Sequence, residues 1–293
     1  MDKSIILKSF DDAIVKCKNS SYLARKIGNS VQHNLNFFDE KDGVKMDIET
    51  FTYDNGMSIT LIHNLDYQDY GDGKTYQEEW WDIGELNDNG VKYTMLDDQS
   101  YDFFEYQKDY IIKNYGKDGW DFFSKYANVY ASYEGMNLNG FLRGVINKED
   151  INNNDGEFYI SDFLMDNHER FVDMLKNIPA DNKSFMSCRV VSKLHNNDSI
   201  SKKIVSDKGH TSTSLNENED YYSTFADTDG CWKIFTIVNE GSGVNAGFLG
   251  SAIQDIDGYD WEREVNFAPD QKFERLVIDE ENGIIIQKPI PIK

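Results

Sequence analysis

Trp232-Lys233-Ile234-Phe235-Thr236-Ile237-Val238 is a run of mainly β-branched and aromatic residues in the second half of the chain. Such residues suit the pleated, half-buried surface of a sheet. Short runs of the same kind lie on both sides of it, at Met186 to Val191, Glu264 to Phe267, Phe273 to Ile278 and Gly283 to Ile286. We therefore expect this part of the chain to form a mostly antiparallel sheet.

Helical periodicity dominates the residues before that sheet. From Tyr101 to about Tyr130, apolar side chains recur at the spacing of a buried helix face. The candidate buried positions are Phe104, Tyr106, Tyr110, Ile111, Phe122, Phe123 and Tyr126. Shorter helices are expected at Leu138 to Ile146 and at Phe158 to Ile178. A helical half followed by an antiparallel half predicts one α+β domain over residues 97–293.

Residues 1–96 are predicted to form a separate, small α+β domain. From Ser9 to Phe38, apolar residues have a roughly helical spacing. From Val44 to Leu96, short β-rich runs alternate with Asp54-Asn55-Gly56 and Asn87-Asp88-Asn89-Gly90, and Asn-Gly between apolar runs is typical of a hairpin. We expect an accessory domain for targeting or partner binding, whose deletion leaves the rest of the chain intact.

Charge and composition restrict the kinds of partner. The 293 residues include 52 acidic and 30 basic side chains, which gives a formal net charge of −22. Such a charge repels phosphate backbones, so it disfavours nucleic acid and favours a basic protein partner. The longest apolar runs, such as Ile284 to Ile286, are far shorter than the ~20 residues of a membrane helix, so we expect no membrane span.

No metal site and no disulfide framework are expected. Cys17, Cys188 and Cys231 are widely spaced and form no Cys-x-x-Cys pair. The segment from Asp150 to Asp162 resembles a calcium loop, but it places Ile151 where the first oxygen ligand belongs. The first residues lack the apolar run of a general secretory signal. A cytosolic site of action is therefore expected, and delivery to a host cell by another route stays open.

Three separated motifs in the second half combine residue types that suit one chemistry. Arg189 lies in the β-rich run Ser187-Cys188-Arg189-Val190-Val191. The hydroxyl cluster Ser212-Thr213-Ser214 follows, and then Trp261-Glu262-Arg263-Glu264-Val265. Because alternate residues of a strand lie on the same face, Glu262 and Glu264 can face one substrate.

In this order, the motifs resemble those of the mono-ADP-ribosyltransferases of the Arg / Ser-Thr-Ser / Glu-x-Glu type, a family that includes actin-modifying clostridial toxins and many bacterial and phage effectors. Tyr133 and the segment Leu138 to Gly144 resemble the family's Tyr…Ile-Asn-x-x-Leu-Arg helix. The resemblance covers about residues 97–290. It implies an ADP-ribosyltransferase-like fold, with a helical lobe and an antiparallel β core around an NAD cleft.

The resemblance implies an enzyme that transfers ADP-ribose from NAD to an arginine of a target protein and releases nicotinamide. Glu264, Glu262, Ser212 and Arg189 would then be the catalytic residues. Cleavage of the nicotinamide–ribose bond develops positive charge on the ribose, and Glu264 is the carboxylate expected beside it. Ser212 would orient Glu264. Glu262 would hold the incoming guanidinium, and Glu rather than Gln there implies an arginine acceptor.

The same resemblance implies the residues that bind NAD. Arg189 and Arg143 would contact the diphosphate, since a guanidinium is permanently charged and multidentate. The backbone of Val190 would bind the nicotinamide amide. The remaining expected contacts are Asn139, Tyr133, Ser212, Thr213, Ser214 and an aromatic ring from among Tyr221, Tyr222 and Phe225. His210 stands two positions before the Ser-Thr-Ser, where the family usually has an aromatic residue.

Two other functions fit the sequence. An NAD glycohydrolase would use the same residues, with water in place of the acceptor. A non-catalytic interaction module would bind a basic partner through its acidic surface and leave the pocket idle. The presence of Arg189, Ser212 and Glu264 together argues against the second alternative.

Overall fold

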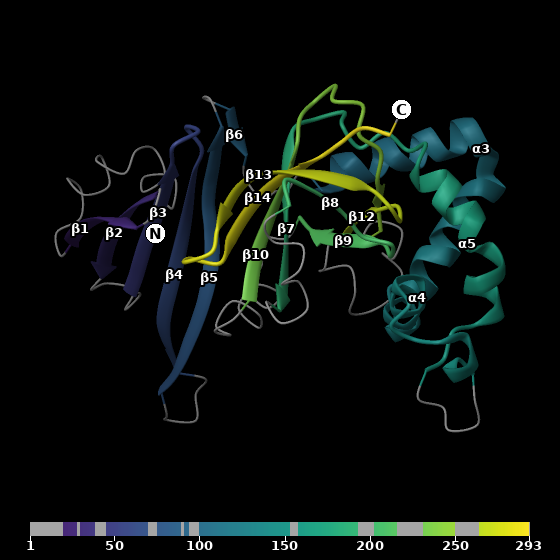
Figure 1. Ribbon diagram of the computed structural model, residues 1–293, viewed down its shortest axis with the longest axis horizontal. Coiled ribbons are helices and arrows are strands. Elements are labelled where there is room, and N and C mark those ends of the chain that lie inside the picture. The colour runs from purple at the N-terminus through teal and green to yellow at the C-terminus, as the bar shows by residue number, and fades with distance from the viewer. Residues whose placement is uncertain are drawn as a thin grey trace.

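The structure is a computed structural model of the 293-residue chain. It describes residues 20–27, 30–38, 45–69, 75–88, 91–93, 100–152, 158–192, 202–215, 231–249 and 264–292. These residues form an α+β fold, with one sheet at the N-terminal end, a second sheet in the middle and the helices beyond it (Figure 1). The predicted fold class is confirmed.

The first sheet contains six antiparallel strands in chain order. They are β1 (Ser20–Ile27), β2 (Ser30–Phe38), β3 (Lys45–Tyr53), β4 (Ser58–Asp69), β5 (Thr75–Asp88) and β6 (Val91–Tyr93). The predicted Asp54-Asn55-Gly56 turn joins β3 and β4, and Gly56 has a φ of 86°, a conformation that glycine adopts without strain. Asn89 and Gly90 lie outside the described residues, but Asp88 pairs with Val91 across them.

The helices predicted between Ser9 and Phe38 are wrong for the part that is described. Residues 20–27 and 30–38 are strands β1 and β2, and Ile27 pairs with Ser30 across Gly28-Asn29. A Gly-Asn pair between two strands is a two-residue hairpin signal, and Val31, His33, Leu35 and Phe37 alternate as strand residues do. The described part of residues 1–96 is therefore all β, instead of α+β.

The helical half is confirmed. It contains α3 (Ser100–Tyr130), α4 (Tyr133–Arg143), a single turn of 3₁₀-helix (Lys148–Asp150) and α5 (Asp162–Leu175). The Ser132 side chain caps the start of α4, which therefore begins earlier than predicted, and Gly144 ends it in the left-handed conformation. Tyr106, predicted to be buried, is 37% exposed. No helix within the described ranges is long and apolar enough to cross a membrane.

The second sheet has eight strands in the order β11-β12-β9-β7-β10-β14-β13-β8. Their bounds are β7 (Phe185–Ser192), β8 (Ile204–Ser206), β9 (Thr211–Ser214), β10 (Cys231–Val238), β11 (Gly247–Phe248), β12 (Glu264–Phe267), β13 (Lys272–Asp279) and β14 (Ile284–Pro289). All five predicted strands are confirmed. The pairings are antiparallel except that of β10 with β14, which is parallel.

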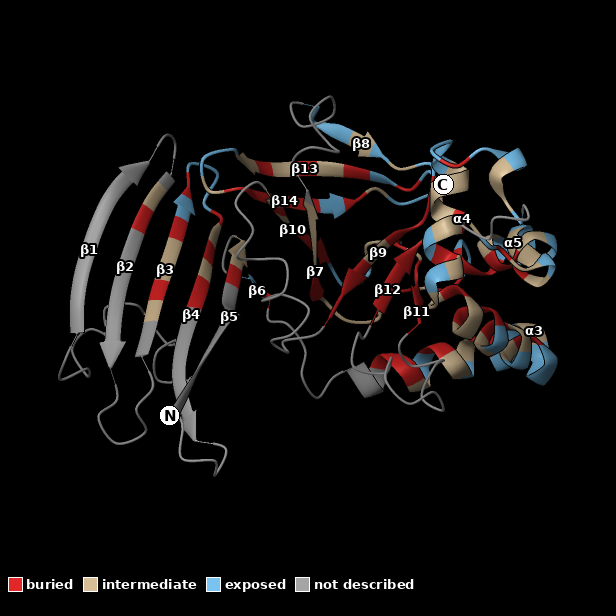
Figure 2. Ribbon diagram, turned by 90° about the horizontal axis from the view of Figure 1, so that it is seen from below, coloured by how far each residue is buried: buried red, intermediate tan, exposed pale blue. Residues whose placement is uncertain are grey.

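The two sheets share a hydrophobic core. Side chains of β3 to β6 and the β3–β4 turn pack against one face of β7, β10, β13 and β14 in a single buried cluster. Tyr53 donates a hydrogen bond to Asp279, and Asn55 donates one to the carbonyl of Leu276 across the same contact. Figure 2 shows buried residues along both facing sets of strands. The boundary at residue 96 remains a prediction, and this contact gives it a physical test.

Candidate active site

A pocket of about 300 Å³ brings two of the predicted motifs together. Its floor is Ser212, Thr213 and Ser214 on β9 and Glu264 on β12. The register of the sheet explains this meeting, because Glu264 pairs with Ser214, and Asn266 pairs with Ser212. The opposite wall is formed by the end of α3, the start of α4 and the turn between them. Its residues are Tyr130, Ala131, Ser132, Gly135, Met136 and Asn139.

The Glu264 side chain is buried and is held by neighbouring polar groups. Asn266 Nδ2 donates to Glu264 Oε1 at 3.0 Å and to Ser212 Oγ at 3.1 Å. Burial raises the pKa of Glu264, and hydrogen bonds with Ser212 and Asn266 partly oppose this rise. A carboxylate fixed in a poorly solvated pocket exerts a strong field on a positive charge that forms beside it.

Tyr130 is a pocket residue that the sequence did not indicate as functional. Its hydroxyl accepts a hydrogen bond from Asn139 Nδ2 at 2.7 Å, and burial together with the charge of Glu264 raises its pKa to about 12. Tyr133, the predicted tyrosine, is 59% exposed at the start of α4 and does not line this pocket. The tyrosine ring close to Glu264 is therefore that of Tyr130, three residues before the predicted Tyr133.

Asn139 braces the helical wall against β9. It lines the pocket as predicted, but both ends of its amide already have partners. Its Nδ2 donates to Tyr130, and its Oδ1 accepts from the backbone N–H of His210 at 2.8 Å. Gly209 allows this close approach, because a Cβ there would lie 2.9 Å from Asn139 Oδ1. Asn139 therefore positions Tyr130 and the start of β9.

Both predicted arginines lie in a second pocket of about 280 Å³ and do not line the pocket of Glu264. Arg143 donates to both carboxylate oxygens of Asp207, at 2.8 and 2.7 Å, and Nη2 also donates to the carbonyl of His210 at 3.1 Å. Arg143 and Arg189 both lower the pKa of Asp207. The two pockets are neighbours, since Asn139 and Arg143, which lie one turn apart on α4, line one each.

Val190, the other predicted β7 residue, lines neither pocket. Its side chain packs against the core shared by the two sheets, and its backbone pairs with Lys233 of β10. Within the described residues, β7 pairs with β9 through Cys188 and Ser214 alone. The predicted contact of the Val190 backbone with the nicotinamide amide would therefore lie on the edge of β7 that faces β9, beyond Cys188.

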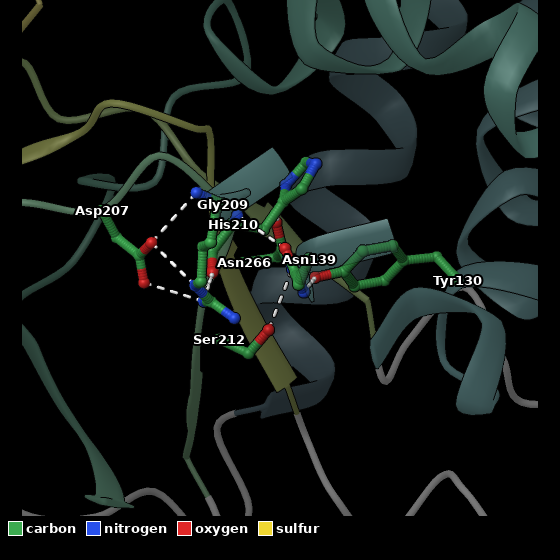
Figure 3. A network of polar contacts seen from close by, with 8 residues as sticks. Tyr130, Asn139, Asp207, Gly209, His210, Ser212 and Asn266 are labelled. Carbon is green, nitrogen blue, oxygen red and sulfur yellow. Dashed lines mark hydrogen bonds and ion pairs between the residues drawn. The ribbon is translucent and has the colours of Figure 1, made fainter. Parts of the chain in front are cut away.

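A chain of polar contacts links α5 to Glu264. Figure 3 shows its central part, with His210, Asn266 and Ser212 labelled. His168 on α5 lies with its Nε2 3.0 Å from Nε2 of His210. His210 is buried, and its Nδ1 lies 2.8 Å from Oδ1 of Asn266. The His210 ring also packs against Tyr130 and Phe171. His210 thus occupies the expected aromatic position as a packed ring that also forms hydrogen bonds.

The pKa of His210 predicts acid sensitivity of the fold. Burial, and then His168, lower this pKa to about 3, whereas an unfolded histidine titrates near about 6.5. Below about pH 6.5 the unfolded chain binds a proton on this histidine that the folded chain does not bind, so the free energy of unfolding falls as pH drops toward 3. The expected loss is about 2 kcal/mol between pH 7 and 5. Urea unfolding at both pH values should show this loss, and His210→Gln should show a smaller one. An equal loss in both proteins would contradict this assignment.

Several predicted residues lie outside the described parts of the chain. These are Glu262, Tyr221, Tyr222 and Phe225, and their roles remain predictions. Among the described residues, no group of three or more His, Cys, Asp or Glu side chains is arranged to hold a metal ion.

Comparison with known proteins gives structural resemblances only. No protein-family model matches the chain, and no curated protein matches it. Three solved structures of the ADP-ribosyltransferase Vis resemble it. The complex of Vis with agmatine has a TM-score of 0.42 and 14% identity, and the match covers 66% of this chain and 83% of that one.

The second Vis structure, a complex with the M6 inhibitor, has a TM-score of 0.41 and 15% identity, over 68% of this chain and 86% of that one. The third, described as Vis toxin from Vibrio splendidus, has a TM-score of 0.39 and 14% identity, over 68% and 87%.

Proposed function

We propose that this protein cleaves NAD and transfers the ADP-ribose to an arginine side chain of a target protein, with release of nicotinamide. The observation that carries the proposal is the buried Glu264 carboxylate, held beside Ser212 in a pocket that adjoins a cationic one. The same residues belong to the Arg / Ser-Thr-Ser / Glu-x-Glu pattern of the sequence.

The proposed role of Glu264 follows from the charge that develops during cleavage. The bond between the nicotinamide nitrogen and the ribose C1′ breaks, and nicotinamide leaves with the bonding electron pair. The ribose becomes oxocarbenium-like, as in glycoside hydrolysis. Glu264 is expected to lie beside that charge, because a fixed carboxylate needs no reorganisation when the charge forms. Ser212 and Asn266 keep its oxygens in place.

The cationic pocket supports binding of the NAD diphosphate. Among the described residues, its lining includes Arg143, Arg189, Arg275 and Lys208, against the one carboxylate of Asp207. This group of positive side chains contrasts with the net charge of −22 of the whole chain. It favours binding of an anionic group of a ligand. We propose that NAD spans both pockets, with its diphosphate near Arg143 and Arg189 and its nicotinamide ribose near Glu264. A diphosphate would then compete with Asp207 for Arg143.

The proposed acceptor is a guanidinium. A nitrogen of the arginine would attack C1′ on the face opposite nicotinamide, form the new C–N bond and pass its proton to Glu262. This role for Glu262 rests on its place two residues before Glu264 in the sequence, since alternate strand residues share a face. The acidic character of the chain favours a basic target protein.

The test is turnover of NAD by the purified protein, with and without agmatine as a soluble guanidine. We expect nicotinamide release that increases with agmatine, and a product whose mass equals agmatine plus ADP-ribose minus one water. Equal release with no labelled agmatine would assign the glycohydrolase alternative. A folded protein that binds NAD and releases no nicotinamide under either condition would contradict the proposal and favour the interaction module.

A further inference from the structure

Asn266 is a polar residue at an otherwise apolar position. It is fully buried on β12 between Val265 and Phe267, which are also buried. An unsatisfied amide at such a site would cost about 1–3 kcal/mol. Here the amide is satisfied on both ends, because Nδ2 donates to Glu264 and Ser212, and Oδ1 faces His210. The contacts therefore give Asn266 a specific orientation.

The hydrogen bonds of this amide determine the protonation of two rings. An amide oxygen can only accept, so the Nδ1 that faces Asn266 Oδ1 must carry a proton. His210 is neutral near pH 7, since its pKa is about 3, and its Nε2 is therefore bare. The partner of that bare nitrogen is His168 Nε2 at 3.0 Å, which must donate. One tautomer of each histidine is compatible with the full set of contacts.

The opposite orientation of the amide is disfavoured for the same reason. A flipped Asn266 would point its oxygen at the Glu264 carboxylate and its NH₂ at His210 Nδ1. Two acceptors would then face each other in a buried site, and His210 could accept the NH₂ on Nδ1 only by carrying its proton on Nε2, where it faces His168. The backbone of His210 is itself anchored, because its N–H donates to Asn139 and its carbonyl accepts from Arg143. The Glu264 carboxylate thus sets the orientation of Asn266, and donation from His168 to His210 Nε2 favours the His210 tautomer that this orientation needs.

We propose that Asn266 is a positioning residue for Glu264, and that His168, by donating to His210 Nε2, holds His210 in the tautomer whose Nδ1–H donates to Asn266 Oδ1. The proposal deepens the function above, since it rests on Glu264 being the residue that stabilises the ribose charge. His168 is a partly exposed residue of α5, so the chain of contacts extends from near the surface of the helical layer to the reacting group.

A matched pair of variants at His168 tests the proposal without altering the buried residues. His168→Gln keeps an N–H donor for His210 Nε2, whereas His168→Leu has a side chain of similar size and no donor. We expect kcat for nicotinamide release to fall by about threefold to tenfold in His168→Leu, the effect of one lost hydrogen bond. His168→Gln should stay near wild type, and KM for NAD should be unchanged in both.

Two NMR measurements read the proposal independently of turnover. Ring-nitrogen spectra should show the proton of His210 on Nδ1 and that of His168 on Nε2. Titration of the isotope-labelled Glu264 carboxyl should give a higher pKa in His168→Leu than in wild type, because its hydrogen bond from Asn266 is less persistent. The Gln variant should titrate as wild type does.

The outcomes separate this inference from the proposed function. A proton on Nε2 of His210, or a Leu variant with wild-type kcat and unchanged Glu264 titration, would overturn the inference while NAD turnover still stands. A wild-type protein that cleaves no NAD would contradict the proposed function, and the positioning of Glu264 by Asn266 would then have no role in catalysis. In that case the ring protons and the Glu264 titration still decide whether the His168–His210–Asn266 contacts control the carboxylate.

Discussion

Glu264→Gln is expected to reduce nicotinamide release by about a hundredfold to a thousandfold, the usual effect of removing one preorganised charge-stabilising group. Gln keeps the shape of Glu and can still accept the hydrogen bond from Asn266. It cannot supply the negative charge next to the ribose. Binding of NAD should change little, because the variant leaves the cationic pocket intact.

The same substitution is expected to stabilise the fold at neutral pH. Burial raises the pKa of Glu264 above its unfolded value, so the folded state favours the protonated carboxyl. The stability that the protonated Glu264 carboxyl contributes is fully present below its unfolded pKa and is lost as pH rises through its folded pKa. Near pH 7 the wild type therefore carries the cost of a buried charge, which Gln removes. The melting temperature should increase at pH 7 and change less at acidic pH.

Glu274→Gln is the matched control for this prediction. Glu274 lies on β13 of the same sheet, where it forms ion pairs with Lys203 and Lys288 at the surface. The same chemical change there should leave nicotinamide release unchanged and should lower stability slightly, if at all. A Glu264→Gln protein with normal turnover, or with a lower melting temperature than the wild type at pH 7, would contradict our assignment of Glu264.

Glu264→Gln also tests the effector or toxin role that the sequence resemblance implies. A cytosolic ADP-ribosyltransferase effector should arrest the growth of a cell that expresses it, and the Gln variant should be tolerated at the same expression level. Modified target proteins can then be recovered from the wild-type culture by mass spectrometry of ADP-ribosylated arginine. Equal growth of both cultures would leave the proposed chemistry standing but would argue against a toxic target in that cell.

The meeting of Ser212 with Glu264 follows from the sequence more directly than the other contacts of the site do. The hydroxyl cluster and the glutamates lie in short strands, and adjacent pairing of those strands brings them together. Arg189 is different, because its position depends on where β7 stops pairing with β9. Sequence spacing carries no information on that point, and Arg189 accordingly lies in the neighbouring pocket.

Other parts were missed because several patterns fit the same residues. The apolar residues before Phe38 fit a helical period loosely, while the decisive Gly28-Asn29 signal is only two residues long. Tyr130 is the last residue of α3 and Tyr133 is the first residue of α4. The path of the chain at Ser132, between them, decides which ring faces Glu264. His168 and His210 are 42 residues apart, so tertiary packing alone brings them into contact.

Removal of residues 1–96 is expected to abolish soluble folding of the rest, in contrast to the separable domain that the sequence suggested. The shared core would then expose its second-sheet side chains, which are Met186, Cys188, Phe235, Ile237, Val277, Ile284 and Ile286. Each large apolar side chain that loses its cover forfeits about 1.5–3 kcal/mol. Net stabilities of whole proteins are only about 5–15 kcal/mol. The truncated protein should therefore aggregate or lack a cooperative unfolding transition.

Point variants in the full-length protein test the same contact on a finer scale. Ile59 on β4 is fully buried in the shared core, so Ile59→Ala should cost about 2–5 kcal/mol. Val91 on β6 of the same sheet is 44% exposed, so Val91→Ala should change stability by no more than about 0.5 kcal/mol. Because the core belongs to both sheets, the loss at Ile59 should shift one common unfolding transition, including that of the Glu264 pocket. Two separate transitions, or a soluble and active 97–293 fragment, would show instead that the boundary at residue 96 divides independently folding domains.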